Sequence, residues 1–377
     1  MSAEVGVASQ FPFPTLEHIP SVPLVVATLG PATDSVIDAI AAQAEIARIH
    51  GVHNPIDKYE QRAAAFLAAP NPHDRDRRVF ADLEGFGVRT SPNTRTRVIG
   101  PGDIVEFLFQ GYGEVDGVVN VQDDVSQFVE TEHLVSMGDS KVWMTVEDVV
   151  KGGIVRCRVN RTPRDEAWEL VANKGINFPQ TEFPDVLIDR DIERMHELAD
   201  SAFVPDYIGL SFTQTPELLE QARKLAHQLG MHSVNFIVKI ENQVGARNVR
   251  SIIEALDGGD ATMAAFGDMV PELVHKPKIT NVLVDIHTYS AYFRRNWMAC
   301  TGLGQSLLES PEPSTSETVA LGLIARLGGW LCLSGDELAM NFKYPVQAVQ
   351  ALRDIVDESA DLAALTLAGM PKNGAQR

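Results

Sequence analysis

Short apolar runs alternate with segments of helical spacing through most of this sequence. Eight runs have the length and composition of buried strands, and they begin at Pro23, Glu45, Arg78, Asp206, Phe236, Ala261, Asn296 and Gly329. Residues 249–256 show the i, i+3, i+4, i+7 spacing of a helix, and residues 216–230 run from a proline to a glycine stop. Eight strands with helices between them predict an α/β fold, a closed parallel (β/α)8 TIM barrel. An open doubly wound sheet is the weaker alternative, because no G-x-G-x-x-G motif follows a strand.

One segment interrupts this alternation. From about residue 91 to 173 the pattern changes to short strand-like runs joined by turns, among them GDIVEFLFQG, KVWMTVEDV and GIVRCRVNR. We interpret residues 91–173 as a small inserted β domain after the third strand, with residues 1–90 and 174–377 forming the barrel. Such an insert would act as a lid that keeps water from the site.

Composition and charge restrict the possible partners. With 45% hydrophobic residues the chain can bury a large core, and 32 basic against 51 acidic residues give a net charge of −19. This charge argues against nucleic acid or an anionic membrane surface as the main partner, but it permits a small anionic substrate in a local basic pocket. No apolar run reaches ~18 residues, the first residues lack the basic-then-apolar pattern of a signal peptide, and the three cysteines are too scattered for a disulfide framework. We therefore expect a cytoplasmic protein.

Polar residues gather where the predicted strands end. Catalytic groups of such barrels lie at the carboxyl ends of strands, and these ends carry Arg48, Asp82, Ser211, Lys239, Glu241, Asp268, Thr301 and Ser334. Lys239 and Glu241 are two apart, so they point to the same side of an extended chain. Each residue alone also has an ordinary explanation, as a helix cap or as one half of a buried ion pair.

Two of these carboxylates predict a metal site. Glu241 and Asp268 offer hard oxygen ligands and leave positions open for water and substrate, which suits Mg²⁺ or Mn²⁺. Lys239 beside such a cation could neutralise an enolate or a transferring phosphoryl group. The turn at Gly267 could present backbone N–H groups to an anion. The predicted substrate-binding residues are Ser211, Gly267, Asp268 and Thr301.

Several motifs resemble those of pyruvate kinases. ATLGPAT (27–33) is similar to the family's CTIGPAS, and FIVKIENQVGARN (236–248) is similar to ISKIENHEGVRN. NKGINFPQ resembles the K-G-V-N-L-P-G that closes that family's inserted domain. AAFGD occurs where the family has VARGD, and ACTG occurs where it has CATQ. The motifs keep the family's order from about residue 22 to 356, which supports the barrel with its insert.

The resemblance implies roles for the residues that match. Lys239 would face the oxygen of phosphoenolpyruvate or of the pyruvate enolate. Glu241 and Asp268 would hold the divalent metal, and Thr301 would lie on the face of the enolate that receives a proton. Three basic residues would bind the phosphate groups, including those of a nucleotide: Arg48, Arg89 and Lys174.

The sequence also departs from the family's pattern. Of the residues expected to bind K⁺, only Asp82 remains, because the other positions hold His50, Val52 and Leu83. These changes argue against K⁺ binding there. Glu84 stands where the family has a lysine, and Phe266 where it has an arginine.

Three functions stay open at this point. The first is phosphoryl transfer between phosphoenolpyruvate, or a close analogue, and an acceptor. The second is a metal-dependent lyase, an aldolase or decarboxylase that forms a 2-oxo-acid enolate without moving phosphate. The third is a non-catalytic relative. Because the sequence ends where pyruvate kinases begin a regulatory C-terminal domain, we expect no allosteric control by a sugar phosphate and, if the chain oligomerises, a homodimer through barrel faces.

Overall fold

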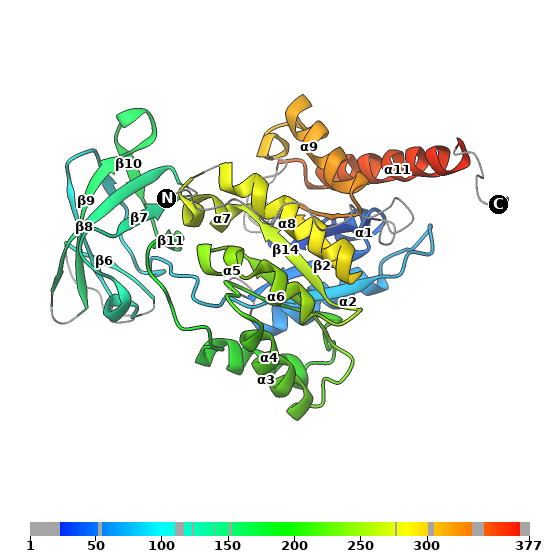
Figure 1. The fold of residues 1–377 in the computed structure, drawn as a ribbon, viewed down its shortest axis with the longest axis horizontal. Helices are drawn as coiled ribbons and strands as arrows, with labels where there is room; N and C mark the ends of the chain where they lie inside the picture. The colour runs from blue at the N-terminus through cyan, green and yellow to red at the C-terminus, as the bar shows by residue number, and fades with distance from the viewer. Residues whose placement is uncertain are drawn as a thin grey trace, which may run out of the picture.

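A closed parallel barrel forms the centre of the molecule (Figure 1). The computed structural model describes residues 23–51, 55–109, 117–122, 124–138, 140–150, 153–275, 277–300, 305–333 and 343–369. Within these residues the barrel strands are β1 (Val25–Leu29), β2 (Ile46–His50), β3 (Arg78–Asp82), β12 (Tyr207–Leu210), β13 (Asn235–Ile240), β14 (Ala261–Ala265), β15 (Asn296–Cys300) and β16 (Trp330–Cys332). Seven of these strands lie inside the predicted runs, and β13 begins one residue before its run, at Asn235. The predicted TIM barrel is confirmed.

Side-chain alternation divides the barrel interior into an apolar layer and a polar layer. Inward-facing apolar side chains fill the lower part, among them Ile46, Phe80, Ile237, Met263, Met298 and Trp330. Every second residue of a strand faces the same side. Two residues after Ile46, Phe80 and Ile237, toward the carboxyl ends of the strands, the inward-facing residues are therefore Arg48, Asp82 and Lys239. The polar layer therefore lies on a packed apolar floor at the carboxyl ends of the strands.

Helices surround the barrel and bury the outward faces of its strands. They are α1 (Ile37–Ala41), α2 (Ile56–Ala68), α3 (Asp189–Asp200), α4 (Pro216–Gln228), α5 (Gln243–Arg247), α6 (Val249–Glu254), α7 (Phe266–Leu273), α8 (Pro277–Phe293), α9 (Thr315–Arg326) and α11 (Pro345–Gly369). The two predicted helical segments correspond to α6 and α4. In the described part of the chain, no helix is both long enough and apolar enough to cross a membrane.

Local sequence explains where two of these helices begin. Thr215 caps α4 through its side chain, and Pro216 at the first position has a backbone suited to a helix start. The side chain of Asn242 accepts a hydrogen bond from the Gly245 N–H, which starts α5 directly after β13. The chain thus leaves the strand that carries Lys239 by a tight, capped turn.

The inserted segment forms its own sheets between β3 and β12. Its strands are β4 (Arg97–Ile99), β5 (Ile104–Leu108), β6 (Val119–Asn120), β7 (Leu134–Met137), β8 (Val142–Val150), β9 (Ile154–Arg161), β10 (Trp168–Leu170) and β11 (Ile176–Asn177). Six make a sheet in the order β11-β7-β8-β9-β5-β6, and β10 pairs with β4. Short 3-10 helices are η3 (Ser126–Phe128) and η4 (Pro163–Asp165) here, and η5 (Gln305–Leu308) in the barrel.

A separate apolar core stabilises this insert. Buried side chains such as Val105, Phe107 and Val146 pack with one another and not with the barrel core. The inserted β domain is therefore confirmed as a separate sheet structure that stands beside the barrel (Figure 1). The limits 91–173 stay a prediction, and the pairing of β11 with β7 joins residues 176–177 to the insert's sheet.

Candidate active site

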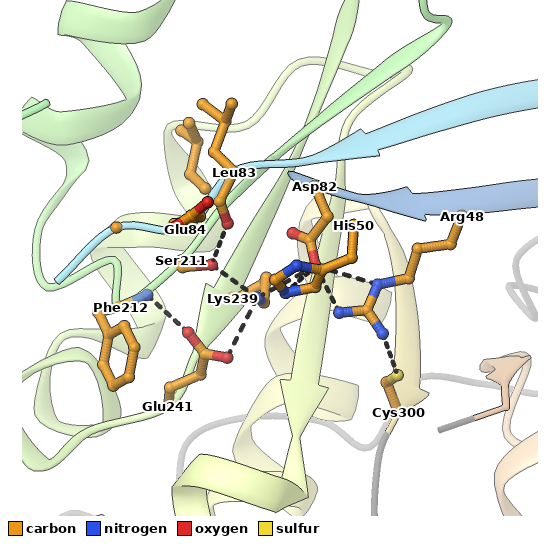
Figure 2. Close-up of polar contacts among 12 residues, drawn as sticks. Arg48, His50, Asp82, Leu83, Glu84, Ser211, Phe212, Lys239, Glu241 and Cys300 are labelled. Carbon is orange, nitrogen blue, oxygen red and sulfur yellow. Dashed lines mark hydrogen bonds and ion pairs between the residues drawn. The ribbon is translucent and has the colours of Figure 1, made fainter. Parts of the chain in front are cut away.

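Lys239 lies at the centre of the polar layer (Figure 2). The residue is 4% exposed, and its Nζ donates a hydrogen bond to Ser211 Oγ at 2.6 Å. The same ammonium is 3.3 Å from Glu241 Oε1 and 3.4 Å from Asp82 Oδ2. Ser211 Oγ in turn donates to the Leu83 carbonyl at 2.6 Å. These contacts hold the ammonium in one position at the mouth of the barrel.

Asp82 gathers the basic side chains around it. Arg48 forms a two-point contact with Oδ2, through Nε at 3.0 Å and through Nη2, and His50 Nε2 lies 3.8 Å from the same oxygen. Burial by itself would raise the pKa of Asp82, but the charges of Lys239 and Arg48 outweigh it and hold that pKa well below its usual range. Asp82 is therefore an ionised anchor for the positive groups.

This arrangement does not fit a monovalent cation at Asp82. Oδ2 already faces Arg48, Lys239 and His50, which leaves the buried Oδ1, an atom without a hydrogen-bond partner in the described part of the chain, as the one carboxylate oxygen of Asp82 open to a cation. Leu83 is buried and apolar. A K⁺ ion needs several oxygen ligands and would meet positive charge instead.

Glu241 and Asp268 line the same cavity. Glu241 Oε2 accepts a hydrogen bond from the Phe212 N–H at 2.6 Å, and Asp268 Oδ1 accepts one from Asn177 Nδ2 at 3.1 Å. Burial raises the pKa of Glu241 to about 7; the charge of Lys239 opposes this rise, and that of Asp268 adds to it.

The chemistry of this pair fits a divalent cation. Two hard oxygen donors repel each other across a shared cavity, and a bound Mg²⁺ or Mn²⁺ would remove that repulsion. Within the described residues, no group of three or more His, Cys, Asp or Glu side chains forms a metal cluster. A cation at Glu241 and Asp268 would therefore take its other ligands from water and substrate.

Two residues beside this pair were not predicted from the sequence. Glu272 follows Asp268 by one helical turn on α7, and burial together with the charge of Asp268 raises its pKa to about 8. Asn177 on β11 donates to both carboxyl groups. It thereby ties the last strand of the insert to α7. The four-residue spacing of Asp268 and Glu272 was the available signal.

Most of the predicted residues converge here. The cavity is lined by five of them: Arg89, Ser211, Lys239, Glu241 and Asp268. Arg48 and Asp82 are buried in the adjoining polar layer, and Gly267 lies in the first turn of α7. Lys174 is exposed and is not among the described lining residues, so its phosphate role stays a prediction. Three predicted positions lie outside the described residues: Val52, Thr301 and Ser334.

The reversed charge at Glu84 is balanced from a distant helix. Arg190, at the start of α3, places Nε 3.1 Å from Glu84 Oε2 and donates to the Gly85 carbonyl at 2.7 Å. Both side chains line a second hollow, and Glu84 also lines the first cavity. Phe266, where an arginine was expected, packs against the apolar core.

Comparisons with known proteins support this fold and identify the family. The model of the family described as "Pyruvate kinase, barrel domain" matches residues 22–349. The pyruvate kinase of Aeropyrum pernix is 29% identical over 343 residues, covering 88% of this chain and 69% of that protein. The pyruvate kinase of Bacillus licheniformis is 24% identical over 346 residues, covering 89% of this chain but only 57% of that protein.

A solved structure extends the comparison to three dimensions. The crystal structure of pyruvate kinase from Pyrobaculum aerophilum aligns with a TM-score of 0.74 at 21% identity. The alignment covers 89% of this chain and 73% of that one. At this identity the likeness supports the fold, while the family match is carried by the sequence comparison.

Proposed function

The chain belongs to the pyruvate kinase family, and from this premise we propose that it transfers a phosphoryl group between phosphoenolpyruvate, or a close analogue, and a nucleotide. One observation carries the proposal: Lys239, Glu241 and Asp268 converge on one cavity at the carboxyl end of the barrel. Phosphoryl transfer depends mainly on positioning and on neutralising charge, and this cavity offers the buried ammonium of Lys239 and two carboxylates that would hold a divalent metal. The relatives are kinases by name, which favours this reaction over the lyase left open by the sequence.

Lys239 would stabilise the enolate. Burial alone would lower its pKa, but Asp82 and Glu241 raise it above its usual value, so the ammonium stays charged at neutral pH. Ser211 donates its own proton to the Leu83 carbonyl and therefore accepts from Lys239. The ammonium thus needs no rearrangement as negative charge develops on the substrate oxygen.

Glu241 and Asp268 would hold Mg²⁺ or Mn²⁺. When bound, the cation would neutralise negative charge on the substrate's oxygens. The Phe212 N–H holds the Glu241 carboxylate, and the Asn177 amide holds that of Asp268, so both carboxylates are already oriented before a metal binds. Such outer contacts commonly tune the affinity of a metal site.

Arg89, just before the insert, would bind a phosphate group, and the insert would limit the access of water. Arg89 lines the cavity from the segment that leads into the insert, and its Nη1 donates to the Asn173 carbonyl at 3.3 Å. Arg48 would act as a positioning residue, because its guanidinium is engaged with Asp82. Thr301 remains our candidate for the group that delivers the proton.

A direct assay tests the proposal. The purified chain is incubated with phosphoenolpyruvate, ADP and Mg²⁺, and pyruvate and ATP are measured separately. Phosphoryl transfer predicts equal amounts of both products and their joint loss in the Lys239→Met variant. Neither product, or pyruvate without ATP, would contradict the proposal. Pyruvate formed from oxaloacetate without any nucleotide would support the lyase instead.

A further inference from the structure

Two cysteines lie side by side in the upper layer of the barrel interior. Cys300 ends β15 and Cys332 ends β16, and the two residues are direct partners in the parallel pairing of these strands. Their Sγ atoms are 2.9 Å apart, and their side chains are 0% and 3% exposed. Both residues belong to the cluster that fills the barrel, above Met298 and Trp330.

A chain of polar contacts joins this pair to the candidate active site. Arg48 Nη1 donates to Cys300 Sγ at 3.5 Å (Figure 2). Cys300 donates to Cys332 Sγ, and Cys332 donates to the Leu333 carbonyl at 3.7 Å. The guanidinium that anchors Asp82 therefore also faces a sulfur atom. Burial raises the pKa of the Cys332 thiol, and the positive charge of Arg48 opposes this rise.

The backbone permits a bond between the two sulfurs. Neighbouring strands are spaced about 4.8 Å apart, which lies within the range of roughly 4.4–6.8 Å found between the Cα atoms of disulfides. Cys157 offers an internal comparison. It is buried in the insert, where its strand partners are Val105 and Val146 and not another cysteine.

We propose that Cys300 and Cys332 form a modification site at which hydrogen peroxide, or a similarly small peroxide, converts two thiols into a reversible disulfide. The Cys300 sulfur attacks one peroxide oxygen, the O–O bond breaks, and Cys300 sulfenic acid and one water form. The Cys332 sulfur then attacks the Cys300 sulfur, the S–O bond breaks, and a second water leaves with the remaining proton. Two thiols and one peroxide thus give one disulfide and two waters.

The neighbouring thiol has a protective consequence. Without Cys332, the sulfenic acid of Cys300 would be open to further oxidation to a sulfinic acid, an anion that thiols do not reduce. That anion would lie beside Arg48 and compete with Asp82 for its guanidinium. Cys332 therefore acts as a resolving cysteine that keeps the polar layer intact. This inference does not depend on the proposed phosphoryl transfer.

Counting thiols in the full chain tests the inference without any variant. The protein is treated with hydrogen peroxide, quenched, unfolded and titrated for thiols, and its peptides are mapped by mass spectrometry. We expect two of the three thiols to disappear, a cross-linked peptide that joins Cys300 to Cys332, and the return of all three thiols after dithiothreitol. Three remaining thiols, or oxidised Cys300 with no cross-link, would overturn the inference.

Two variants sharpen this result. Cys157→Ser is the matched control and should leave the cross-link unchanged, because Cys157 lies in the separate core of the insert. Cys332→Ser should lose the cross-link, and its oxidised Cys300 should no longer be restored by dithiothreitol. Full restoration of Cys300 in Cys332→Ser would show that no resolving cysteine is needed and would refute this role.

Discussion

Glutamine at position 241 should stabilise the metal-free protein at alkaline pH. Glu241 is 1% exposed, and burial raises its pKa from 4.5 to about 7 despite the opposing charge of Lys239. The folded protein therefore binds this proton more tightly than the unfolded chain does. Its free energy of unfolding falls as the pH rises from 4.5 to about 7 and then stays at the lower level.

The size of the effect follows from the two pKa values. Each tenfold change in proton affinity corresponds to about 1.4 kcal/mol, so ionising Glu241 in the folded protein costs on the order of 3 kcal/mol at pH 8. A glutamine resembles the neutral acid and can still accept from the Phe212 N–H. Glu241→Gln should therefore be more stable than the wild type by about 3 kcal/mol at pH 8, and by less than about 1 kcal/mol at pH 5.

Urea unfolding in the presence of a chelator measures this difference at both pH values. Glu254→Gln, at an exposed position on α6, is the matched control and should show no such pH-dependent gain. The same Glu241→Gln protein should lose Mn²⁺ binding, since one of the two carboxylates is gone. A variant that is less stable than the wild type at pH 8, or equally stabilised at both pH values, would refute the reasoning.

Other expected outcomes concern the neighbouring groups. Lys239→Met should lower kcat by about 10²–10³ because one preorganised charge is lost, and a steady-state assay that finds only KM changed would contradict this role. Asn177→Ala should weaken Mn²⁺ binding about 10–100-fold, measured by electron paramagnetic resonance, because Asp268 loses its outer contact; Asn160→Ala, in the same insert, should not. Replacing K⁺ by tetramethylammonium should leave the rate unchanged, because positive side chains surround Asp82, and a K⁺ requirement would contradict that geometry.

The barrel was predictable because parallel strands buried on both faces are continuous apolar runs. β1 and β14, for example, are buried at every position. Strands of two or three residues in the insert, such as β6 and β11, were not predicted. Their existence depends on pairing with partners far along the chain, and their own residues carry almost no periodic signal.

The site was partly predictable for a similar reason. Lys239, Glu241 and Asp268 were indicated by the alternation of side chains along strands and by the tendency of catalytic groups in such barrels to lie at the carboxyl ends of strands. The ion pair of Glu84 with Arg190 could not be predicted from the sequence, because Arg190 lies on α3 and the whole insert separates the two residues along the chain. Contacts between residues so distant in sequence follow from the closed fold and leave no local pattern.

The sequence also did not show which way the side chains of a matched motif point. Lys174 matched a motif, but a motif does not say whether its side chain faces a cavity, and in the structure it is exposed. Asn177, three residues further in the same motif, is buried and contacts Asp268. Asn177 lies in β11, whose pairing with β7 fixes its position, whereas Lys174 precedes this strand.

A crystal structure with Mn²⁺ and oxalate, an analogue of the pyruvate enolate, tests the central claim most directly. We expect an anomalous signal for the metal between the carboxylates of Glu241 and Asp268, with an oxalate oxygen facing Lys239 Nζ. Metal bound elsewhere, or oxalate bound away from Lys239, would contradict the account.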